Sequence, residues 1–352
     1  MVSNLATIKP RNPKGMRDFL PAEKRVRDAV LSQMKEVFKS YGFEPLETPA
    51  VEIKEILTGK IGAEEKLIYD VTYKGDTPLA LRYDQTVPLA RVVAQYPELV
   101  KPFKRYQFGN VYRADNPQKG RYREFLQVDI DTVGSSSALS DAEIIACAVK
   151  TYQKLGVKDF KILLNSRPLL ISIIKEAGVQ EDLISQVTIS LDKLDKIGQE
   201  NVAKELSDKG LPGEVITELF RVLSLATPDE NLQEILTILE SAGVEKELVE
   251  FSPSLARGLD YYTGSIFECR VAGFPGSIGA GGRYDNLIGK FTDQENPAVG
   301  FSFGFEPLID LLREQNGLPK AGASAKVLVT VFNKDLVKNS VNAADLFRQT
   351  VP

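Results

Sequence analysis

The residues best suited to chemistry lie in a predicted hairpin from Val111 to Asp131, whose two arms flank a basic loop. The second arm alternates with the period of two that is typical of a β-strand: Leu126, Val128 and Ile130 share one face, and Phe125, Gln127, Asp129 and Asp131 share the other. The loop carries Lys119, Arg121 and Arg123. This combination indicates a pocket for a cationic or amino-bearing ligand beside a phosphate clamp. From these residues alone, an edge hairpin with a salt-bridged outer face is an equally good interpretation.

The residue types in the rest of the chain narrow the chemistry. The sequence contains no histidine and only two cysteines, so it lacks the usual Ser/His or Cys/His nucleophile pair, and a zinc site is not expected. No metal-binding residues are predicted, and any metal chemistry would use oxygen ligands. Catalysis would therefore depend on carboxylates, arginines and the positioning of substrates.

Composition indicates a globular protein of one large domain or two. The 352 residues are 43% hydrophobic and 26% charged, and the net charge is −4. This charge argues against a protein that coats nucleic acid, although a local basic stripe would permit tRNA-type binding. No apolar run approaches the ~20 residues of a membrane span, and the first ten residues lack the apolar core of a signal peptide. We therefore expect no membrane association and a cytoplasmic location.

The elements that must position the hairpin are predicted mainly as strands with flanking helices. A helix begins at Pro21 and continues to about Tyr41, with apolar residues at helical spacing, and an extended segment containing Pro45 and Pro49 follows it. We also expect strands at Leu67 to Tyr73, Pro78 to Arg82 and Lys161 to Asn165, and a helix from Pro88 to about Ala94.

Residues from about 168 to 250 change character, with Leu, Ile and charged residues at helical spacing, and this pattern predicts an all-helical insertion. Strands are expected again at Leu259 to Val271, Gly276 to Gly282 and Ala298 to Phe305, followed by a helix from Leu308 to Glu314. The glycines of the middle strand indicate a close approach to a ligand or to another strand. Residues 319–325 read as a linker, and one strand (Val327 to Phe332) and one helix (Leu336 to Arg348) are predicted after it.

Four stretches together resemble the histidyl-tRNA synthetases, a family of class II aminoacyl-tRNA synthetases. G-F-E-P-L-E-T-P-A-V at 42–51 is similar to class II motif 1, with Pro49 as its interface proline, and the hairpin is similar to motif 2. L-A-R-G-L-D-Y-Y-T-G at 255–264 resembles the histidine-binding signature of the family, and A-G-G-R-Y-D at 280–285 its following glycine-rich strand. The resemblance covers roughly residues 10 to 315 in order and spacing.

The resemblance implies the architecture: an α+β fold in which an antiparallel class II sheet is flanked by helices. The catalytic domain would comprise residues 1–318, with the helical insertion at about 168–250. Residues 326–352 would be the start of a truncated α/β anticodon-binding domain. A homodimer is also implied.

The same resemblance implies a histidine site. It places the substrate α-amino group near Asp84 and Thr86, with Gln127 alongside, and it places Asp131, Tyr261 and Tyr262 around the imidazole. A carboxylate and a phenol can satisfy both nitrogens of an imidazole. Tyrosines in a strand are more often core residues with a satisfied hydroxyl, but the R-G-L-D before this pair favours the pocket.

Arginines would perform the chemistry with ATP. The resemblance implies that Arg113 contacts the α-phosphate, that Arg257 stabilises the transition state from the other side, and that both also contribute to histidine binding. Arg121 and Arg123 would bind the β- and γ-phosphates or the tRNA acceptor end, and Phe125 would stack on adenine. Magnesium would assist as a cofactor.

Two departures from the family pattern leave two functions open. Motif 3 of the family ends in Glu-Arg, whereas this chain has Pro307 at the position of the arginine, and only residues from about 326 onward represent the anticodon-binding domain. The first hypothesis is a histidine-tRNA ligase that converts L-histidine and ATP to histidyl-adenylate and charges tRNA(His). The alternative is a non-catalytic relative that binds histidine or tRNA, like the regulatory subunit of ATP phosphoribosyltransferase.

Overall fold

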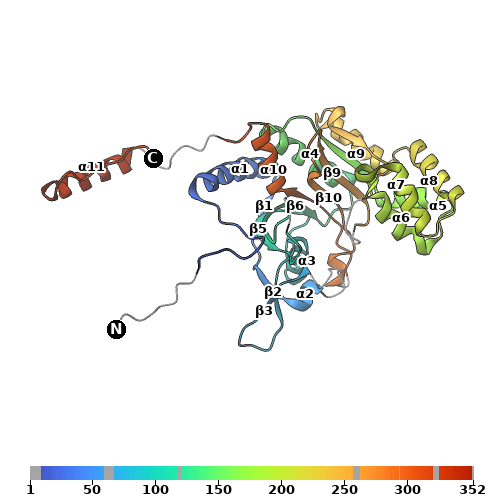
Figure 1. Ribbon diagram of the computed structural model, residues 1–352, viewed down its shortest axis with the longest axis horizontal. Helices are drawn as coiled ribbons and strands as arrows, with labels where there is room; N and C mark the ends of the chain where they lie inside the picture. Colours follow the sequence, from blue (N-terminus) through green and yellow to red (C-terminus); the bar gives the residue numbers. More distant parts are fainter. Residues whose placement is uncertain are drawn as a thin grey trace.

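The computed structural model describes residues 9–58, 67–117, 120–256, 262–292, 294–319 and 325–350. Its main sheet has eight strands in the order β1-β5-β6-β11-β10-β9-β7-β8, and a smaller sheet has the order β2-β4-β3 (Figure 1). The six central strands of the main sheet pair antiparallel, whereas the edge strands β1 and β8 pair parallel with β5 and β7. The expected antiparallel sheet is confirmed, with parallel strands added at both edges.

The strands have the following bounds: β1 Glu44–Pro45, β2 Val51–Ile53, β3 Asp70–Val71, β4 Leu79–Leu81, β5 Phe103–Tyr112, β6 Glu124–Val133, β7 Phe160–Ser166, β8 Val249–Phe251, β9 Ser265–Val271, β10 Ser277–Arg283 and β11 Ala298–Gly304. The α-helices are α1 Pro21–Ser40, α2 Lys54–Thr58, α3 Thr86–Gln95, α4 Ala138–Lys154, α5 Arg167–Glu176, α6 Ile184–Leu191, α7 Leu194–Asp208, α8 Gly213–Leu225, α9 Glu230–Ser241, α10 Phe305–Glu314 and α11 Val337–Thr350.

The predicted hairpin is the pair β5 and β6, which stay in register from Phe103 opposite Val133 to Tyr112 opposite Glu124. Val128 and Ile130 belong to the largest hydrophobic cluster, as the alternation predicts. The opposite face of β6 is also buried, because Gln127, Asp129 and Asp131 each have less than a tenth of their surface exposed. The polar wall is therefore enclosed within the protein, and the edge hairpin with a solvent-facing outer side is excluded.

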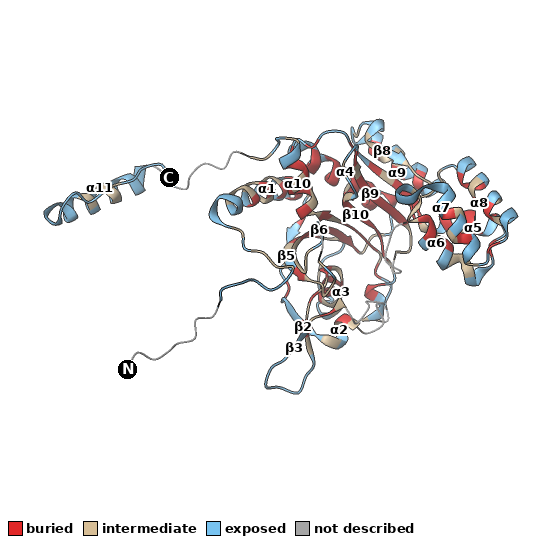
Figure 2. Ribbon diagram, in the orientation of Figure 1, coloured by how far each residue is buried: buried red, intermediate tan, exposed pale blue. Residues whose placement is uncertain are grey.

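Helices cover one face of the main sheet and form the core with it. Apolar residues of α1, α4, α9 and α10 join those of β6, β9 and β11 in one cluster, shown by the buried inner sides of these helices in Figure 2. On α1 the buried apolar residues Val30, Met34, Val37 and Phe38 recur at helical spacing. A second cluster joins α3 and the small sheet to Val133, Tyr284 and Ala298. The polar wall of β6 is thus held between two apolar regions.

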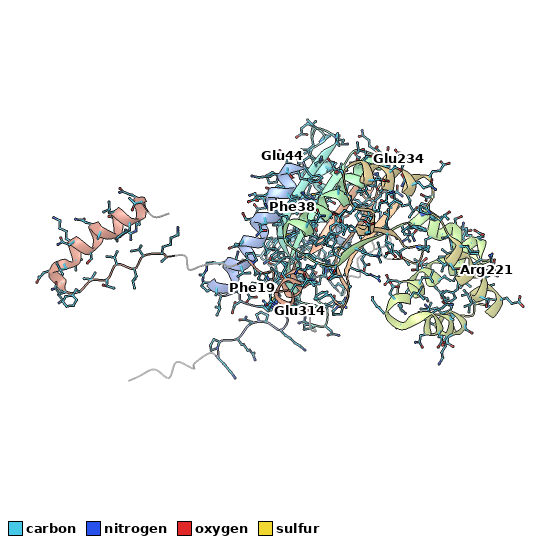
Figure 3. The ribbon with its side chains drawn as sticks, turned by 90° about the horizontal axis from the view of Figure 1, so that it is seen from above. Phe19, Phe38, Glu44, Arg221, Glu234 and Glu314 are labelled. Carbon is cyan, nitrogen blue, oxygen red and sulfur yellow. The ribbon has the colours of Figure 1, made fainter. Side chains whose placement is uncertain are left out.

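The helical segment predicted at 168–250 divides between two cores. Helices α5 to α8 bury their own cluster, which includes Leu170, Val187, Leu206 and Leu219. By contrast, α9 contributes Leu232, Ile235 and Leu239 to the main core. In Figure 3, Glu234 of α9 lies over the main body, whereas Arg221 lies on the separate helical group. The independent part of the insertion therefore ends with α8, and residues 249–251 form strand β8.

One glycine allows β10 to lie close to β11, and another makes room for a side chain of β6. A Cβ atom on Gly281 would lie 2.1 Å from the Gly300 carbonyl oxygen, and a Cβ atom on Gly300 would lie 2.0 Å from a carboxylate oxygen of Asp131. Both distances are far below van der Waals contact, so only glycine fits. The prediction of a close approach at the glycine-rich strand is confirmed.

The expected strand at Val327 to Phe332 does not form, which corrects the prediction. Its residues have the apolar character of a strand, but no described segment pairs with them, and Leu328 and Phe332 are more than four-fifths exposed. A strand needs a ladder partner to satisfy its backbone groups. The following helix α11 is close to its predicted bounds and buries no residue. None of the helices in the described ranges is long and apolar enough to cross a membrane.

Candidate active site

A row of paired residues crosses the face of the main sheet that carries the polar wall of β6. Arg105 on β5 lies opposite Asp131 on β6, Asp131 lies opposite Gly300 on β11, and Gly300 lies opposite Gly282 on β10. Paired residues share a face of the sheet, so the two glycines form a floor that has no side chains of its own, and the Asp131 carboxylate lies over its Gly300 end. A Cβ atom on Gly282 would lie 2.9 Å from the ring of Tyr262, so this ring covers the far end of the row. The Asp131 carboxylate therefore lies at one end of the glycine floor, and the Tyr262 ring lies at the other.

Asp131 is held by two neighbours. The Tyr284 hydroxyl donates to one carboxylate oxygen, and a terminal nitrogen of Arg105 lies 2.7 Å from the other. The side chain of Arg105 is completely buried, and the same nitrogen is 3.7 Å from Asp129. Two buried carboxylates thus share one buried guanidinium, an arrangement that keeps charge in the protein interior.

Five buried acceptor oxygens in and around this pair have no hydrogen-bond donor among the described residues. One is the Asp131 oxygen that faces Arg105, and the others belong to Asp84 (Oδ2), Gln85 (Oε1), Gln127 (Oε1) and Asp129 (Oδ1). The Gln127 amide nitrogen donates to Asp129 at 2.8 Å, which fixes both side chains and leaves their other oxygens unused. Unsatisfied buried acceptors are rare in folded proteins because each one is costly. A ligand with several N–H donors would satisfy this set.

Asp84 reaches the site from the segment before α3. Its Oδ1 accepts from the backbone N–H of Val87 at 3.2 Å, so the carboxylate stabilises the first turn of that helix. Thr86 is the first residue of the helix and is half-buried. Gln85, between them, is fully buried, and its amide nitrogen donates to the Gly109 carbonyl at 2.9 Å. The turn is therefore tied to the end of β5.

Burial shapes the charge of the carboxylates. It raises the pKa of Asp84 to about 6, against the lowering effects of the Val87 N–H and Arg113. Burial also raises the pKa of Asp131 to about 6, and Arg105 and the Tyr284 hydroxyl act in the opposite direction. Burial also raises the pKa of Asp129 above its usual value, although Arg105 acts in the opposite direction. These acids carry an excess of negative charge near neutral pH, so the site favours a cationic ligand.

Arg113 lies just beyond the end of β5, beside this acidic site. Its Nε donates to the Tyr83 carbonyl at 3.0 Å, and its guanidinium lies 5.0 Å from the centre of the Phe125 ring. The structure therefore brings together Arg113, Phe125 and Asp84 as the sequence predicts. An arginine held in this way can contact an anionic group while it faces an aromatic ring.

The loop arginines are held by a residue of their own loop. Arg121 pairs with the Asp115 carboxylate at 2.8 Å, and the Nε of Arg123 donates to the Asp115 carbonyl at 2.8 Å. The Arg121 side chain is 58% exposed, so this ion pair contributes little stability and is easily exchanged for a phosphate.

Arg17 connects this loop to the start of α10. The Arg17 guanidinium lies 3.4 Å from the centre of the Tyr122 ring, and one of its nitrogens is 2.6 Å from the Glu306 carboxylate at the start of α10. Glu306 also pairs with the buried Arg27 at 2.6 Å, and these contacts lower its pKa against the effect of burial. The basic loop is thereby tethered to α10.

The model of the histidyl-tRNA synthetase family matches residues 15–308, which includes the hairpin, the glycine-floored row and the first turn of α10. The chain belongs to the histidyl-tRNA synthetase family. Two relatives, both called histidine-tRNA ligase, are 41% identical to it. The one from Gloeobacter violaceus is matched over 90% of this chain and 78% of its own length, and the one from Aeropyrum pernix over 98% and 84%.

Solved structures agree with this assignment. The histidyl-tRNA synthetase of Nostoc sp. PCC 7120 superposes with a TM-score of 0.85 at 31% identity, over 97% of this chain and 84% of the other. A Bacillus halodurans protein described as an ATP phosphoribosyltransferase regulatory subunit/histidyl-tRNA synthetase has a TM-score of 0.73 at 24% identity, which shows a shared fold. The fold is thus that of a class II synthetase.

The family signature at 255–264 is only partly visible in the structure. Arg257 and Tyr261, the predicted catalytic arginine and one predicted imidazole ligand, lie outside the described residues, as does Lys119 of the basic loop. Tyr262 is described, and its ring lies over Gly282 at the far end of the row. It precedes β9, which begins at Ser265, so the strand predicted from Leu259 is shorter than expected.

Sequence reasoning missed Arg105 and Tyr284 of this histidyl-tRNA synthetase site, and it placed Asp129 on the polar face without giving it a separate role. A signal for Arg105 was present, because Arg105 and Gln107 alternate with aromatic residues on β5 as Asp129 and Asp131 alternate with apolar residues on β6. Polar alternation on both arms of a hairpin indicates a polar face that continues across the strands. Tyr284 carried no such signal, because its contact with Asp131 spans 153 residues of sequence.

Proposed function

We propose that this chain activates L-histidine with ATP to give histidyl-adenylate and pyrophosphate, and then transfers the histidyl group to tRNA(His). The observation that carries the proposal is the set of buried, unsatisfied acceptors at Asp84, Gln127 and Asp129, next to Asp131 and the glycine floor. The α-ammonium group of an amino acid offers three N–H donors to that set. Family membership supports histidine as the amino acid.

The proposed histidine pocket lies along the row of paired residues. The ammonium group would bind the acceptors near Asp84 and Gln127, and the imidazole would contact the Asp131 carboxylate and the Tyr262 ring, which lie over Gly300 and Gly282. Glycine at both positions supports this role for the two side chains, because a Cβ at either position would displace Asp131 or Tyr262. We also propose Thr86, Tyr261 and Arg257 as contacts of the bound amino acid.

Adenylate formation needs little chemistry from the protein. An oxygen of the histidine carboxylate attacks the α-phosphorus of ATP, a P–O bond forms, and the bond to pyrophosphate breaks. The carboxylate is already a nucleophile, so no general base is required, and stabilisation of charge is the main contribution. We propose Arg113 and Arg257 for this role, Phe125 for the adenine, and Arg121 and Arg123 for the outer phosphates or the tRNA end. ATP would enter as its magnesium complex, a common mode of magnesium binding.

Histidine-dependent exchange of labelled pyrophosphate into ATP tests the function. We expect exchange with histidine and none with phenylalanine, because phenylalanine leaves the Asp131 carboxylate without a donor. Calorimetric titration with histidine should be run alongside. Binding without exchange would favour the regulatory alternative, and neither binding nor exchange would refute the proposed site.

The regulatory alternative has less support. Its structural relative is 24% identical and shares the fold, whereas the two relatives called histidine-tRNA ligase are 41% identical over most of the chain. Arg113 is also retained beside the pocket, and amino-acid binding alone does not need a phosphate-binding arginine.

We further propose that the protein acts as a homodimer through the segment that resembles motif 1. Pro45 and Pro49 are exposed, and Val51 and Ile53 next to them are 38% and 46% exposed. Proline cannot donate to a β-ladder, so it is confined to strand edges that do not pair further. Exposed apolar side chains beside such an edge are suited to a subunit interface. Sedimentation velocity should give the mass of two chains, and Ile53→Asp should shift it toward one. A parent protein that sediments as one chain at micromolar concentration would contradict the proposal.

A further inference from the structure

Arg105 is a buried charge that the adenylation chemistry does not use. It has no exposed surface, it lies directly opposite Asp131 in the β5-β6 ladder, and its contacts are with the polar wall. Its terminal nitrogens lie 2.7 Å from Asp131, 3.7 Å from Asp129, 3.4 Å from the Gln107 side chain and 3.4 Å from the Gln85 carbonyl. A buried arginine beside the proposed histidine pocket needs an explanation beyond packing, because the desolvation of its charge is costly.

We infer that Arg105 is a positioning residue for histidine selection: it holds the Asp131 carboxylate ionised and fixed in place, so that this carboxylate can accept a hydrogen bond from the imidazole. The inference rests on the proposed function, because it names how the same pocket recognises its substrate. Arg105 itself stays behind the carboxylate and acts through it.

The geometry supports this division of roles. One oxygen of Asp131 accepts from Tyr284 across Gly300, and the other faces Arg105, so the carboxylate plane is fixed from two sides. Each carboxylate oxygen has two lone pairs, which leaves acceptor capacity for an imidazole N–H. A pocket that presents a fixed acceptor selects for a donor at that point and rejects an amino acid without one.

Charge is the second part of the role. The charged and titratable groups around Asp131 in the described chain are Arg105 on β5, Asp129 on β6, Tyr284 after β10, Asp84 before α3 and Arg113 after β5. Burial and Asp129 raise the pKa of Asp131, and Arg105 is the strongest opposing influence. Without Arg105 this pKa would rise above about 6, and the carboxylate would begin to take up a proton near neutral pH.

The experiment measures kcat/KM for histidine in pyrophosphate exchange from pH 5 to 9 for the parent, Arg105→Gln and Arg105→Lys. Loss of kcat/KM on the acid side reports ionisations of free enzyme and free substrate. The titration of histidine itself is common to all variants, so a difference between them comes from the protein. We expect the acid-side midpoint of Arg105→Gln to move upward by about one pH unit or more, and Arg105→Lys to restore it.

Asp129→Asn is the matched variant, and it should shift the acid-side midpoint in the opposite direction. It removes a negative charge that raises the pKa of Asp131, so its acid-side midpoint should move downward. It also carries the test if Arg105→Gln fails to fold, which thermal melting would reveal. A purely structural role for Arg105 would lower the melting temperature without moving either midpoint.

The outcomes separate the two proposals. A parent protein that neither binds histidine in calorimetry nor supports exchange refutes the proposed function, and the inference fails with it. A parent that supports exchange, together with a folded Arg105→Gln whose midpoint matches the parent, overturns the inference alone. An Asp129→Asn midpoint that stays at the parent value would also overturn it.

Discussion

Asp131→Ala should lower kcat/KM for histidine activation by about a hundredfold, because a hydrogen bond to a charged group contributes about 1.5 to 3 kcal/mol. The substitution removes the acceptor proposed for the imidazole and, among the described residues, leaves Arg105 with only Asp129 at ion-pair distance. KM for ATP should change little, since Arg113 and Phe125 contact each other at the end of the hairpin without Asp131. Pyrophosphate exchange with histidine varied at saturating ATP, and then the reverse, measures both constants.

Asp131→Asn is the matched control for Asp131→Ala. It keeps the size of the side chain and one acceptor oxygen, but it lacks the negative charge that pairs with Arg105, so it should retain more stability and still lose selectivity. Both variants need thermal melting, because breaking a buried ion pair can cost about 3 to 5 kcal/mol of stability. A folded Asp131→Ala with the kcat/KM of the parent would show that the imidazole binds elsewhere.

Pro307→Arg should speed pyrophosphate exchange at sub-saturating ATP by at least about tenfold. In the family this position carries the motif 3 arginine, which is expected to lie over the adenine opposite the motif 2 aromatic residue and near the γ-phosphate. Pro307 is the third residue of α10, and β11 before it ends with Gly304 opposite Gln127, so the helix begins beside the part of β6 that holds Phe125. A cation–π contact of about 1 to 2 kcal/mol corresponds to roughly five- to thirtyfold in ATP use, and a contact with the γ-phosphate would add to this gain.

The proline itself fits the fold. The first-turn N–H groups of a helix lack partners within the helix, so a missing N–H costs little there. Pro307→Ala is therefore the matched control: it removes the ring without adding charge and should give no gain. If the parent already reacts rapidly and the arginine adds nothing, another cation has taken over the role. If both forms bind histidine and neither reacts, the regulatory alternative is correct.

The structure narrows the candidates for such a substitute cation. Arg313 pairs with Asp310 on its own helix and lies 3.8 Å from Glu23 of α1, on the helical side of the sheet. Arg17 is better placed, because it contacts Glu306, the residue before Pro307, and stacks on Tyr122 of the basic loop. If Arg17 is the substitute, Arg17→Met should raise KM for ATP in the parent and have a smaller effect in Pro307→Arg. Equal effects in both backgrounds would assign Arg17 to loop tethering alone.

Local patterns in the sequence determined the elements of this protein and the face that carries the chemistry. The alternation from Phe125 to Asp131 predicted strand β6 and its polar wall, since side chains on a strand alternate strictly between two faces. Glycines in β10 predicted a close approach, because only a missing side chain permits it. The resemblance to the family, and not a local pattern, implied roles for Asp84, Arg113 and Gln127.

The tertiary structure alone decided which of these groups face one another and what charge they carry. Arg105 joins Asp131 only because β5 and β6 pair in one particular register, and Tyr284 reaches the same carboxylate only because β11 lies between β6 and β10. Burial, which no local pattern specifies, raises the pKa of Asp131 to about 6. The strand expected at Val327 to Phe332 shows the converse, because a segment with strand-forming residues stays irregular where no described segment offers its backbone a partner.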